Sequence, residues 1–454
     1  MRLPPPHTLL VLAVVVCAPG VIFLGALRSY LAVETPGRAT SVYDFDDVDA
    51  VLAQAVDSRA FPGCAGRVGD ASGVLHTALH GSQTYGLAPP AGGENRAVDA
   101  TTLFDMASLT KVVATTTAVM TFYQRGELDL DMLVSDESLL GAAFAGQGKD
   151  TIRIHNLLVH NAGFPPDPVP NFWSVDFACP QTSSDPAHHP AEDFSCQDKI
   201  YAALLVQTLI NPVGAKYVYS DLSMITTMYI VGIKARDLVY VAAGDLLPGC
   251  DQGGADRNAA AMCYYEAYVR LHVMQPLGMT SSQFRLPEAQ WRDTMPTWND
   301  TVYQHRVMQG FVSDGNAYAL GGIAGHAGLF SHLDDVTTFA KRILFAAPDD
   351  ALVNATTVAH FTRVQNATQS SRALGWNTNA PDNDYNGCSS LSAATFTHTG
   401  YTGTQICMDP VRQIFTILLT NRVYPDNANA DNIHRVRRDY NHDVQVAVDA
   451  ARAK

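Results

Sequence analysis

Apolar residues recur at helical spacing within the stretch FDMASLTKVVATTTAVMTFYQRGELDLD, residues 104–131. The pattern predicts a helix with Ser108 in its first turn and a stop at Gly126. Serine is favoured at a helix start because its oxygen can accept a hydrogen bond from a free backbone N–H. Lys111 is mildly unfavourable there, because the helix N-terminus already carries partial positive charge. The spacing Ser-x-x-Lys is therefore a weak sign of chemistry when taken alone.

The rest of the pattern predicts strands near both ends of the chain and helices between them. Residues 46–59 fit a helix, and residues 63–86 alternate and turn like a hairpin of two or three strands. Helices are favoured up to about residue 277, including apolar ones at 219–236 and 258–279, with Pro-rich loops between them. Strands are expected at 394–410 and 412–425, and a final helix after Asn427. These elements predict an α+β fold, an antiparallel sheet flanked by helices with an inserted all-α lobe.

The N-terminal run LLVLAVVVCAPGVIFLGAL, residues 9–27, contains no charge and is about long enough to cross a bilayer core. A signal-anchor is favoured over a cleaved signal peptide, because no small-x-small cleavage site follows Leu27. We therefore expect residues 1–44 to be an anchor, or a signal peptide, with its tether, and residues 45–454 to be one domain. The domain would be membrane-anchored and face an extracytoplasmic or secretory lumen, or be secreted.

Composition narrows the classes of function. The chain has 454 residues, is 47% hydrophobic and carries a net charge of −14 without a long basic run. Binding of nucleic acid needs clustered Lys and Arg, so it is not expected. The glycine-rich motifs of dinucleotide and phosphate binding are absent from the sequence. Nothing in the chain indicates an oligomeric state.

Cysteine usage fits an oxidising compartment. Cys179 and Cys196 bracket one polar loop, and Cys250 and Cys263 bracket another, as local disulfides do. A third disulfide between Cys388 and Cys407 is compatible with two late strands, which would leave Cys64 free. No zinc-type spacing occurs, and the pair His188-His189 fits a solvated loop, so no metal or other cofactor is expected. Glycosylation sequons at Asn299, Asn354 and Asn366 support a secretory setting only weakly.

Three short motifs stand in a fixed order along the chain: Ser108-Leu109-Thr110-Lys111, Tyr219-Ser220-Asp221 and His398-Thr399-Gly400. They resemble the S-x-x-K, Y-x-N and K-T-G motifs of serine β-lactamases and penicillin-binding proteins. The tyrosine in the second motif is typical of class C β-lactamases and of their esterase and D-peptidase relatives. The resemblance covers roughly residues 45–450 and implies the β-lactamase/transpeptidase-like fold.

The resemblance implies a serine hydrolase that works through an acyl-enzyme. Ser108 would be the nucleophile, and Lys111 and Tyr219 would together move its proton. The backbone N–H groups of Ser108 and Tyr401 would form the oxyanion hole. Asp221, His398, Thr399 and Gly400 would contact a small-molecule or peptide substrate.

Two positions depart from the family pattern. Asp221 replaces an asparagine, and a carboxylate cannot donate to a substrate carbonyl; beside Lys111 it would favour the charged amine. His398 replaces a lysine, so a permanent cation for a substrate carboxylate is missing. If His398 lines the site, selectivity for anionic substrates should rise as the pH falls through about 6.5. Both changes weaken the case for a true β-lactamase and for a carboxypeptidase that needs a carboxylate anchor, and they leave hydrolysis of esters or of D-amino-acid amides and peptides open.

A second hypothesis is a catalytically silent relative that binds ligands or acts as a scaffold at a membrane. The intact Ser108, Lys111 and Tyr219 favour the enzyme over this alternative. His326 is interpreted as a structural residue of a Gly-rich loop, and His160 as a helix C-terminal residue whose ring satisfies carbonyl groups. Ser313 and Ser331 are interpreted as ordinary loop serines.

Overall fold

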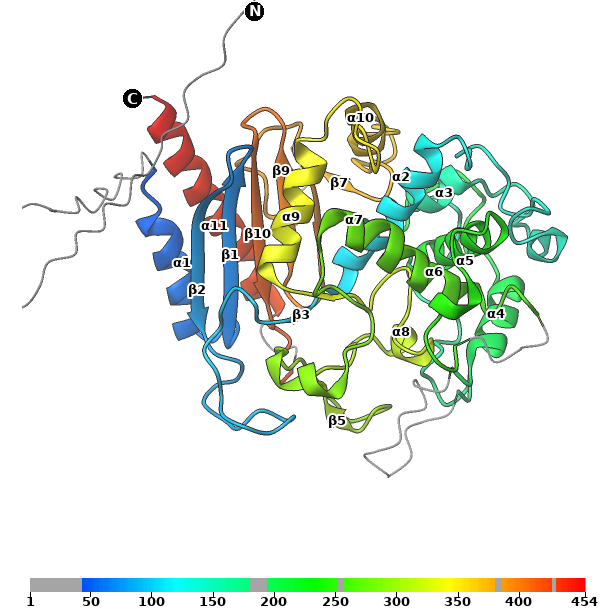
Figure 1. Ribbon diagram of the computed structural model, residues 1–454, viewed down its shortest axis with the longest axis horizontal. Helices are drawn as coiled ribbons and strands as arrows, with labels where there is room; N and C mark the ends of the chain where they lie inside the picture. Colours follow the sequence, from blue (N-terminus) through cyan, green and yellow to red (C-terminus); the bar gives the residue numbers. More distant parts are fainter. Residues whose placement is uncertain (1–42, 180–193, 251–255, 380–385, 427–429, 454) are drawn as a thin grey trace, which may run out of the picture. The chain divides into compact units, whose positions relative to one another are not determined.

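The structure is a computed structural model, and it describes residues 43–179, 194–250, 256–379, 386–426 and 430–453. Its main sheet has the strand order β2-β1-β10-β9-β8-β7, with every neighbouring pair antiparallel (Figure 1). These strands are β1 (Gly63–Asp70), β2 (Val74–Gly81), β7 (Asn377–Thr378), β8 (Phe396–Thr399), β9 (Gln405–Asp409) and β10 (Ile414–Thr420). The N-terminal hairpin therefore joins the C-terminal strands through β1 and β10, which confirms the predicted antiparallel sheet. The hairpin has two strands.

Helices lie on both faces of the sheet and in a lobe beside it (Figure 1). α1 and α11 cover one face and α9 lies on the other, between the sheet and the helical lobe. The helices are α1 (Asp46–Asp57), α2 (Thr117–Gln124), α3 (Ile154–Leu158), α4 (Gln197–Val206), α5 (Asp221–Asp237), α6 (Ala261–Val269), α7 (Gln275–Leu277), α8 (Gly315–Ala319), α9 (Leu333–Leu344), α10 (Ala355–Thr362) and α11 (Ala430–Arg452). The short strands β3 (Phe104–Asp105) and β6 (Phe330–Ser331) pair with each other, as do β4 (Asn299–Asp300) and β5 (Arg306–Val307). The predicted α+β class with an inserted helical lobe is confirmed.

The central strand β10 shows why the sheet is buried on both faces. Its residues alternate between the two sides, so Phe415, Ile417 and Leu419 join the core shared with the lobe. Ile414 and Leu418 join a second core beneath α1 and α11. All residues of the strand are buried, which explains why IFTILLT is nearly continuous in apolar residues.

The stretch around Ser108 is more irregular than the single helix predicted for residues 104–131. Phe104–Asp105 is the strand β3, Ala107–Leu109 is a 3₁₀ turn, Lys111–Thr116 is a π-helix, and α2 ends at Gln124. The prediction was wrong at the start because the buried Asp105 carboxylate accepts a hydrogen bond from the backbone N–H of Ala107 and holds a tight turn there. The stop at Gly126 is confirmed by its positive φ of 70°.

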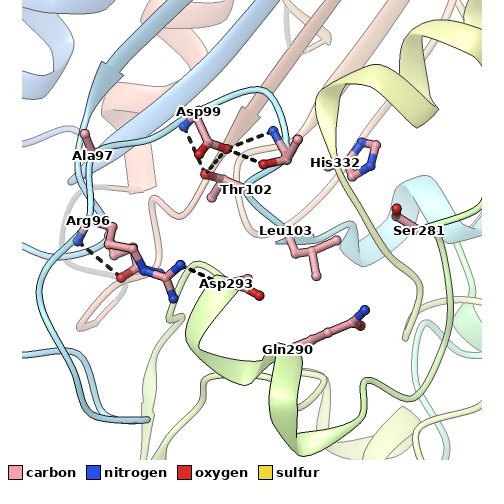
Figure 2. A pocket seen from close by; sticks show the side chains of 11 residues that line it. Arg96, Ala97, Asp99, Thr102, Leu103, Ser281, Gln290, Asp293 and His332 are labelled. Atoms are coloured by element: carbon pink, nitrogen blue, oxygen red, sulfur yellow. Dashed lines mark hydrogen bonds and ion pairs between the residues drawn. The ribbon is translucent and has the colours of Figure 1, made fainter.

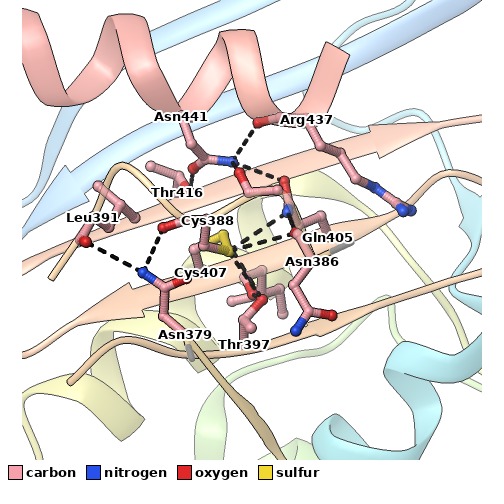
Figure 3. The surroundings of a disulfide bond; sticks show 12 residues. Asn379, Asn386, Cys388, Leu391, Thr397, Gln405, Cys407, Thr416, Arg437 and Asn441 are labelled. Carbon is pink, nitrogen blue, oxygen red and sulfur yellow. Dashed lines mark hydrogen bonds between the residues drawn. A yellow bond between two sulfur atoms is a disulfide. The ribbon is translucent and has the colours of Figure 1, made fainter. Parts of the chain in front are cut away.

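The expected cysteine pairing is found. Disulfides join Cys179 to Cys196, Cys250 to Cys263 and Cys388 to Cys407, and Cys64 is a buried free thiol. The third disulfide joins Cys388 to Cys407 in β9 and lies next to a buried hydrogen-bond network that reaches α11 (Figure 3). In that network, Asn441 donates to the side chain of Gln405 and to the backbone oxygen of Gly387. α11 is thus joined to the end of the sheet that carries the third motif.

Several predictions concern residues outside the described ranges. They include the apolar segment 9–27 and the pair His188-His189. Among the helices that the structure describes, none combines the length and apolar character needed to cross a membrane. The membrane anchor therefore stays a prediction. Of the three sequons, Asn299 and Asn366 are exposed, whereas Asn354 caps the start of α10 with its side chain.

Candidate active site

Lys111 lies at the centre of a group of polar contacts. Its side chain is fully buried, and its ammonium donates to the Ser108 hydroxyl over 2.8 Å and to the backbone oxygen of His326 over 2.9 Å. It also forms an ion pair of 2.8 Å with the carboxylate of Asp221, at the start of α5. The first two motifs predicted from the sequence therefore meet around one amine.

The surroundings of Lys111 favour its charged form. Burial would lower the pKa of this amine, but the charges and hydrogen bonds of Asp221 and Tyr219 more than offset burial and raise it above its ordinary value. This agrees with the expected effect of aspartate in place of asparagine. A protonated Lys111 donates to Ser108 and cannot accept its proton, so the other proton acceptor of the motifs, Tyr219, becomes more important.

Ser108 follows a backbone turn that buried polar groups hold in place. The Asp105 carboxylate accepts hydrogen bonds from the backbone N–H of Ala107 and from both the N–H and the hydroxyl of Ser313, all within 2.9 Å. Ala107 has φ of 45°, which is unusual for a residue with a Cβ and occurs where surrounding contacts impose it. Ser313 was interpreted as an ordinary loop serine, and that was wrong: it is one of the groups that fix the turn before Ser108.

The turn at residues 400–404 is attached to the same segment. Thr402 donates to the backbone oxygen of Asp105 over 2.7 Å, and Thr404 donates to that of Met106 over 3.0 Å. From the other side, the guanidinium of Arg437 on α11 donates to the backbone oxygens of Gly400 and Thr404, each over 2.9 Å. These bonds hold the turn that contains Tyr401 against the segment that leads into Ser108.

Tyr219 lies in the segment just before α5, and this segment is hydrogen-bonded to the loop after α3. The backbone N–H of Ser220 donates to Nδ1 of His160 over 3.1 Å, and the hydroxyl of Ser220 donates to the Pro165 oxygen. The rings of His160 and Tyr219 lie 4.8 Å apart. Lys111 and Arg372 place their cationic groups 4.9 Å and 5.0 Å from the centre of the Tyr219 ring.

The sequence suggested that the ring of His160 bonds to carbonyl groups, but it makes no such bond within the described residues. It does lie in the turn after α3, with φ of 55°, but its ring accepts from Ser220 and packs on Tyr219. Neither its role nor that of Arg372 could be recognised from sequence, because each is brought to Tyr219 only by the packing of distant loops. In the sequence, the only signal of a special position for His160 was the Asn-Ala-Gly turn that follows it.

His398 is buried, with 1% of its surface exposed, and its ring lies 6.2 Å from that of Tyr219. Its Nδ1 donates to the backbone oxygen of Thr399, which fixes the ring on β8. Burial and the charges of Arg372 and Lys111 hold the pKa of His398 well below its ordinary value. The expected change in its charge near pH 6.5 is therefore wrong, and the ring stays neutral at that pH.

A second group of charges borders Lys111 on the side of α8. His326 is buried and its Nε2 lies 3.0 Å from the carboxylate of Asp314. Burial would lower the pKa of His326, but Asp314 and Asp221 raise it above its ordinary value. His326, Asp314 and Asp221 place ligand-type atoms within 4.8 Å of one another, but ion pairs with His326 and Lys111 account for both carboxylates, so we assign no metal.

A cavity of about 310 Å³ lies outside this site (Figure 2). Arg96, Asp99, Gln290 and His332 are among the residues that line it, and the predicted site residues are not. Arg96 is paired with Asp293, and Asp99 accepts hydrogen bonds from Thr101 and Thr102. These contacts satisfy the charges of the cavity within the protein.

Comparison with known proteins shows first a likeness of fold and then the family. The fold resembles that of simvastatin synthase of Aspergillus terreus (TM-score 0.59, 16% identity, covering 88% of this chain and 97% of that one). It also resembles that of EstCE1, a hydrolase with promiscuous acyltransferase activity (TM-score 0.59, 16% identity, 86% and 97%). A class C beta-lactamase mutant is similar at a TM-score of 0.59, with 16% identity and coverage of 87% and 96%. At these identities the likeness shows the fold alone.

The family follows from sequence. The family model described as Beta-lactamase matches residues 48–439, so the chain belongs to the beta-lactamase family and has its serine hydrolase fold. A protein of Salmonella agona (strain SL483) named "Putative D-alanyl-D-alanine carboxypeptidase" is 29% identical over 343 residues, which cover 72% of this chain and 71% of that protein. The resemblance stated from the three motifs is thereby confirmed.

Proposed function

We propose that the protein hydrolyses esters or D-amino-acid amides and peptides through an acyl-enzyme on Ser108. The observation that carries this proposal is the contact of 2.8 Å between the fully buried Lys111 ammonium and the Ser108 hydroxyl, made beside Tyr219. A hydroxyl is a poor nucleophile unless its proton is removed as it attacks, and these residues supply the groups for that step. The names of the relatives, a carboxypeptidase and a hydrolase with acyltransferase activity, are compatible with both substrate classes.

In the proposed mechanism, Tyr219 begins as a phenolate, and Oγ of Ser108 attacks the substrate carbonyl carbon while its proton passes to the phenolate oxygen. The backbone N–H groups of Ser108 and Tyr401 stabilise the negative oxygen that develops. Tyr219 then gives the proton to the departing alcohol or amine. Water attacks the acyl-enzyme in the second half and gives its proton to Tyr219, which returns one to Ser108 as the acid leaves. Lys111 remains an ammonium paired with Asp221, and its positive charge stabilises the negative charge on the oxygens that exchange the proton.

The substrate preference rests on the two departures from the family motifs. Asp221 is engaged with Lys111, and it lacks the N–H donors of the asparagine that it replaces. His398 is neutral and buried and supplies no cation for a terminal carboxylate. Both observations support neutral acyl groups over substrates that need a carboxylate anchor at β8.

The decisive experiment is acylation by a fluorophosphonate or a fluorescent penicillin, with the modified peptide identified by mass spectrometry. We expect the label on Ser108, and we expect Ser108→Ala to lower hydrolysis of a reporter ester about a thousandfold or more without loss of the fold. The exposed Ser138→Ala is the matched control and should behave like the parent. Full activity in a folded Ser108→Ala protein would reject the assignment, and failure of the parent to label or hydrolyse would favour the silent binding protein.

The shared proton path makes a second test possible. Lys111→Ala and Tyr219→Phe should each lower kcat/KM by about a hundredfold to ten-thousandfold. The double variant should be only slightly worse than either single variant, because both residues serve one step. Multiplicative losses would show that the two side chains act independently.

We also propose that the catalytic domain works outside the cytoplasm, either anchored by residues 9–27 or secreted. The three disulfides support this location, because such bonds persist mainly in oxidising compartments. Mass mapping of protein taken from its native compartment, under non-reducing conditions, tests it. All six cysteines found as free thiols would contradict the proposal.

A further inference from the structure

A cationic side chain that the three motifs do not include lies beside Tyr219. Arg372 is buried, with 4% of its surface exposed, and its Nε donates to the hydroxyl of Tyr217 over 3.1 Å. Its Nη1 is also buried and has no hydrogen-bond partner in the part of the chain that the structure describes. Burying a charge without a carboxylate partner is costly, so a guanidinium held here calls for a reason beyond stability.

The loop that carries Arg372, between α10 and β7, is held firmly. The backbone oxygen of Arg372 accepts from Gln365, Leu374 donates to Phe361 in α10, and Gly375 donates to Leu158 in α3. A Cβ at Gly375 would lie 2.1 Å from Oγ1 of Thr116, so the loop packs directly on the helix that carries Lys111. The backbone hydrogen bonds and the packing of this loop therefore fix the position of the Arg372 side chain.

The groups that face Tyr219 differ in charge. Lys111 lies 4.9 Å from the centre of the Tyr219 ring, but the carboxylate of Asp221 offsets the positive charge of Lys111. The rings of His160 and His398 also face Tyr219, and burial, together with the charge of Arg372, holds the pKa of both well below its ordinary value. Both histidines are therefore neutral near pH 7. Arg372, at 5.0 Å, is a full positive charge without a carboxylate partner among the described residues.

We propose that Arg372 is a positioning residue for Tyr219: its guanidinium orients the phenol and stabilises its anionic form during proton transfer. The proposal rests on the proposed function, because it assigns a role in the proton path from Ser108. Tyr219 must accept the proton of Ser108 as the bond to the carbonyl carbon forms, and then release it to the leaving group. A fixed cation beside the ring favours the anion before the first transfer and after the second, and it does not itself gain or lose a proton.

The experiment measures kcat/KM against pH for the full chain and four variants. Arg372→Gln and Arg372→Met remove the charge, Arg372→Lys keeps it, and Tyr217→Phe removes only the hydrogen bond to Nε. Each is tested on a neutral ester and on an anionic ester with the same leaving group, and the fold is checked by thermal unfolding. Fluorophosphonate labelling of the parent is done first, so a parent that fails to label indicates failure of the proposed function and not of this inference.

We expect Arg372→Gln and Arg372→Met to lower kcat/KM by roughly tenfold to a hundredfold on both esters, and to move the acid limb of the profile to higher pH. Arg372→Lys keeps the positive charge and should therefore recover most of the activity and the parent profile, and Tyr217→Phe should lie within about threefold of the parent. If the uncharged variants do not fold, an Arg372→Lys profile that departs from the parent's overturns the proposal. Folded uncharged variants with the parent profile would also overturn it. A loss confined to the anionic ester would overturn it as well, and would identify Arg372 as a substrate anchor.

Discussion

At the scale of single residues, the three sequence motifs located the site, but its electrostatic character depends on groups that they do not contain. The spacing of Ser108 and Lys111 is sufficient to predict their contact, since residues three apart share a helix face. Asp105, His160 and Arg372 have no local pattern that marks them. Their positions follow from loops joined over more than fifty residues of sequence, which a periodicity argument cannot reach.

The neutral state of His398 leads to a prediction at this scale. Because burial and nearby cations keep its pKa well below the ordinary value of about 6.5, the ring stays uncharged as the pH falls through that value. The ratio of kcat/KM for an anionic and a neutral ester of equal reactivity should therefore change by less than about threefold between roughly pH 7.5 and 5.5.

Measuring the ratio cancels the loss of rate that protonation of the catalytic path causes for both substrates. A ratio that rises about tenfold across this interval would mean that His398 gains its proton at the ordinary pH and contacts the substrate directly.

At the scale of elements, the sheet and most helices were predictable because long apolar segments mark them in the sequence. α5 lies close to its predicted range, and so does the helical stretch formed by α6, the π-helix Arg270–Met274 and α7. The C-terminal helix covers the sheet as expected. The segment before Lys111 was not predictable, because a buried carboxylate and a residue with positive φ override its helical pattern. The irregular backbone occurs where Ser108 must be presented.

Gly400 allows the position of the oxyanion turn to be tested. A Cβ there would lie 2.1 Å from Oγ1 of Thr404 and 2.7 Å from the backbone oxygen of Met106, so Gly400→Ala must displace the turn that carries Tyr401. We expect kcat for a reporter ester to fall roughly a hundredfold, as after the loss of one oxyanion donor. Gly244→Ala is the matched control, since nothing lies within 4 Å of its added Cβ. Equal activities of the two folded variants would show that this turn does not stabilise the oxyanion.

At the scale of the whole molecule, the described residues account for a self-contained hydrolase domain. Residues Tyr43–Lys454 form one compact unit, whose sheet is closed on one face by α1 and α11 and on the other by α9 and the lobe. Arg437 on α11 contacts the oxyanion turn, so the last helix supports the site as well as the core.

This organisation predicts that folding and membrane binding can be separated. A variant consisting of residues 43–454 should match the full chain in thermal unfolding and in kcat/KM to within about twofold, because its core and its site are complete.

Only the full chain should float with vesicles of zwitterionic phosphatidylcholine, since 19 uncharged residues at 9–27 are about long enough to enter the bilayer. Val15→Arg in the full chain places a charge in the middle of this segment and should weaken flotation without changing hydrolysis. Zwitterionic lipid is the appropriate choice because the net charge of −14 would complicate binding to charged vesicles. Equal flotation of the full and shortened chains would reject the anchor, and loss of activity on shortening would show that the first 42 residues support the catalytic domain.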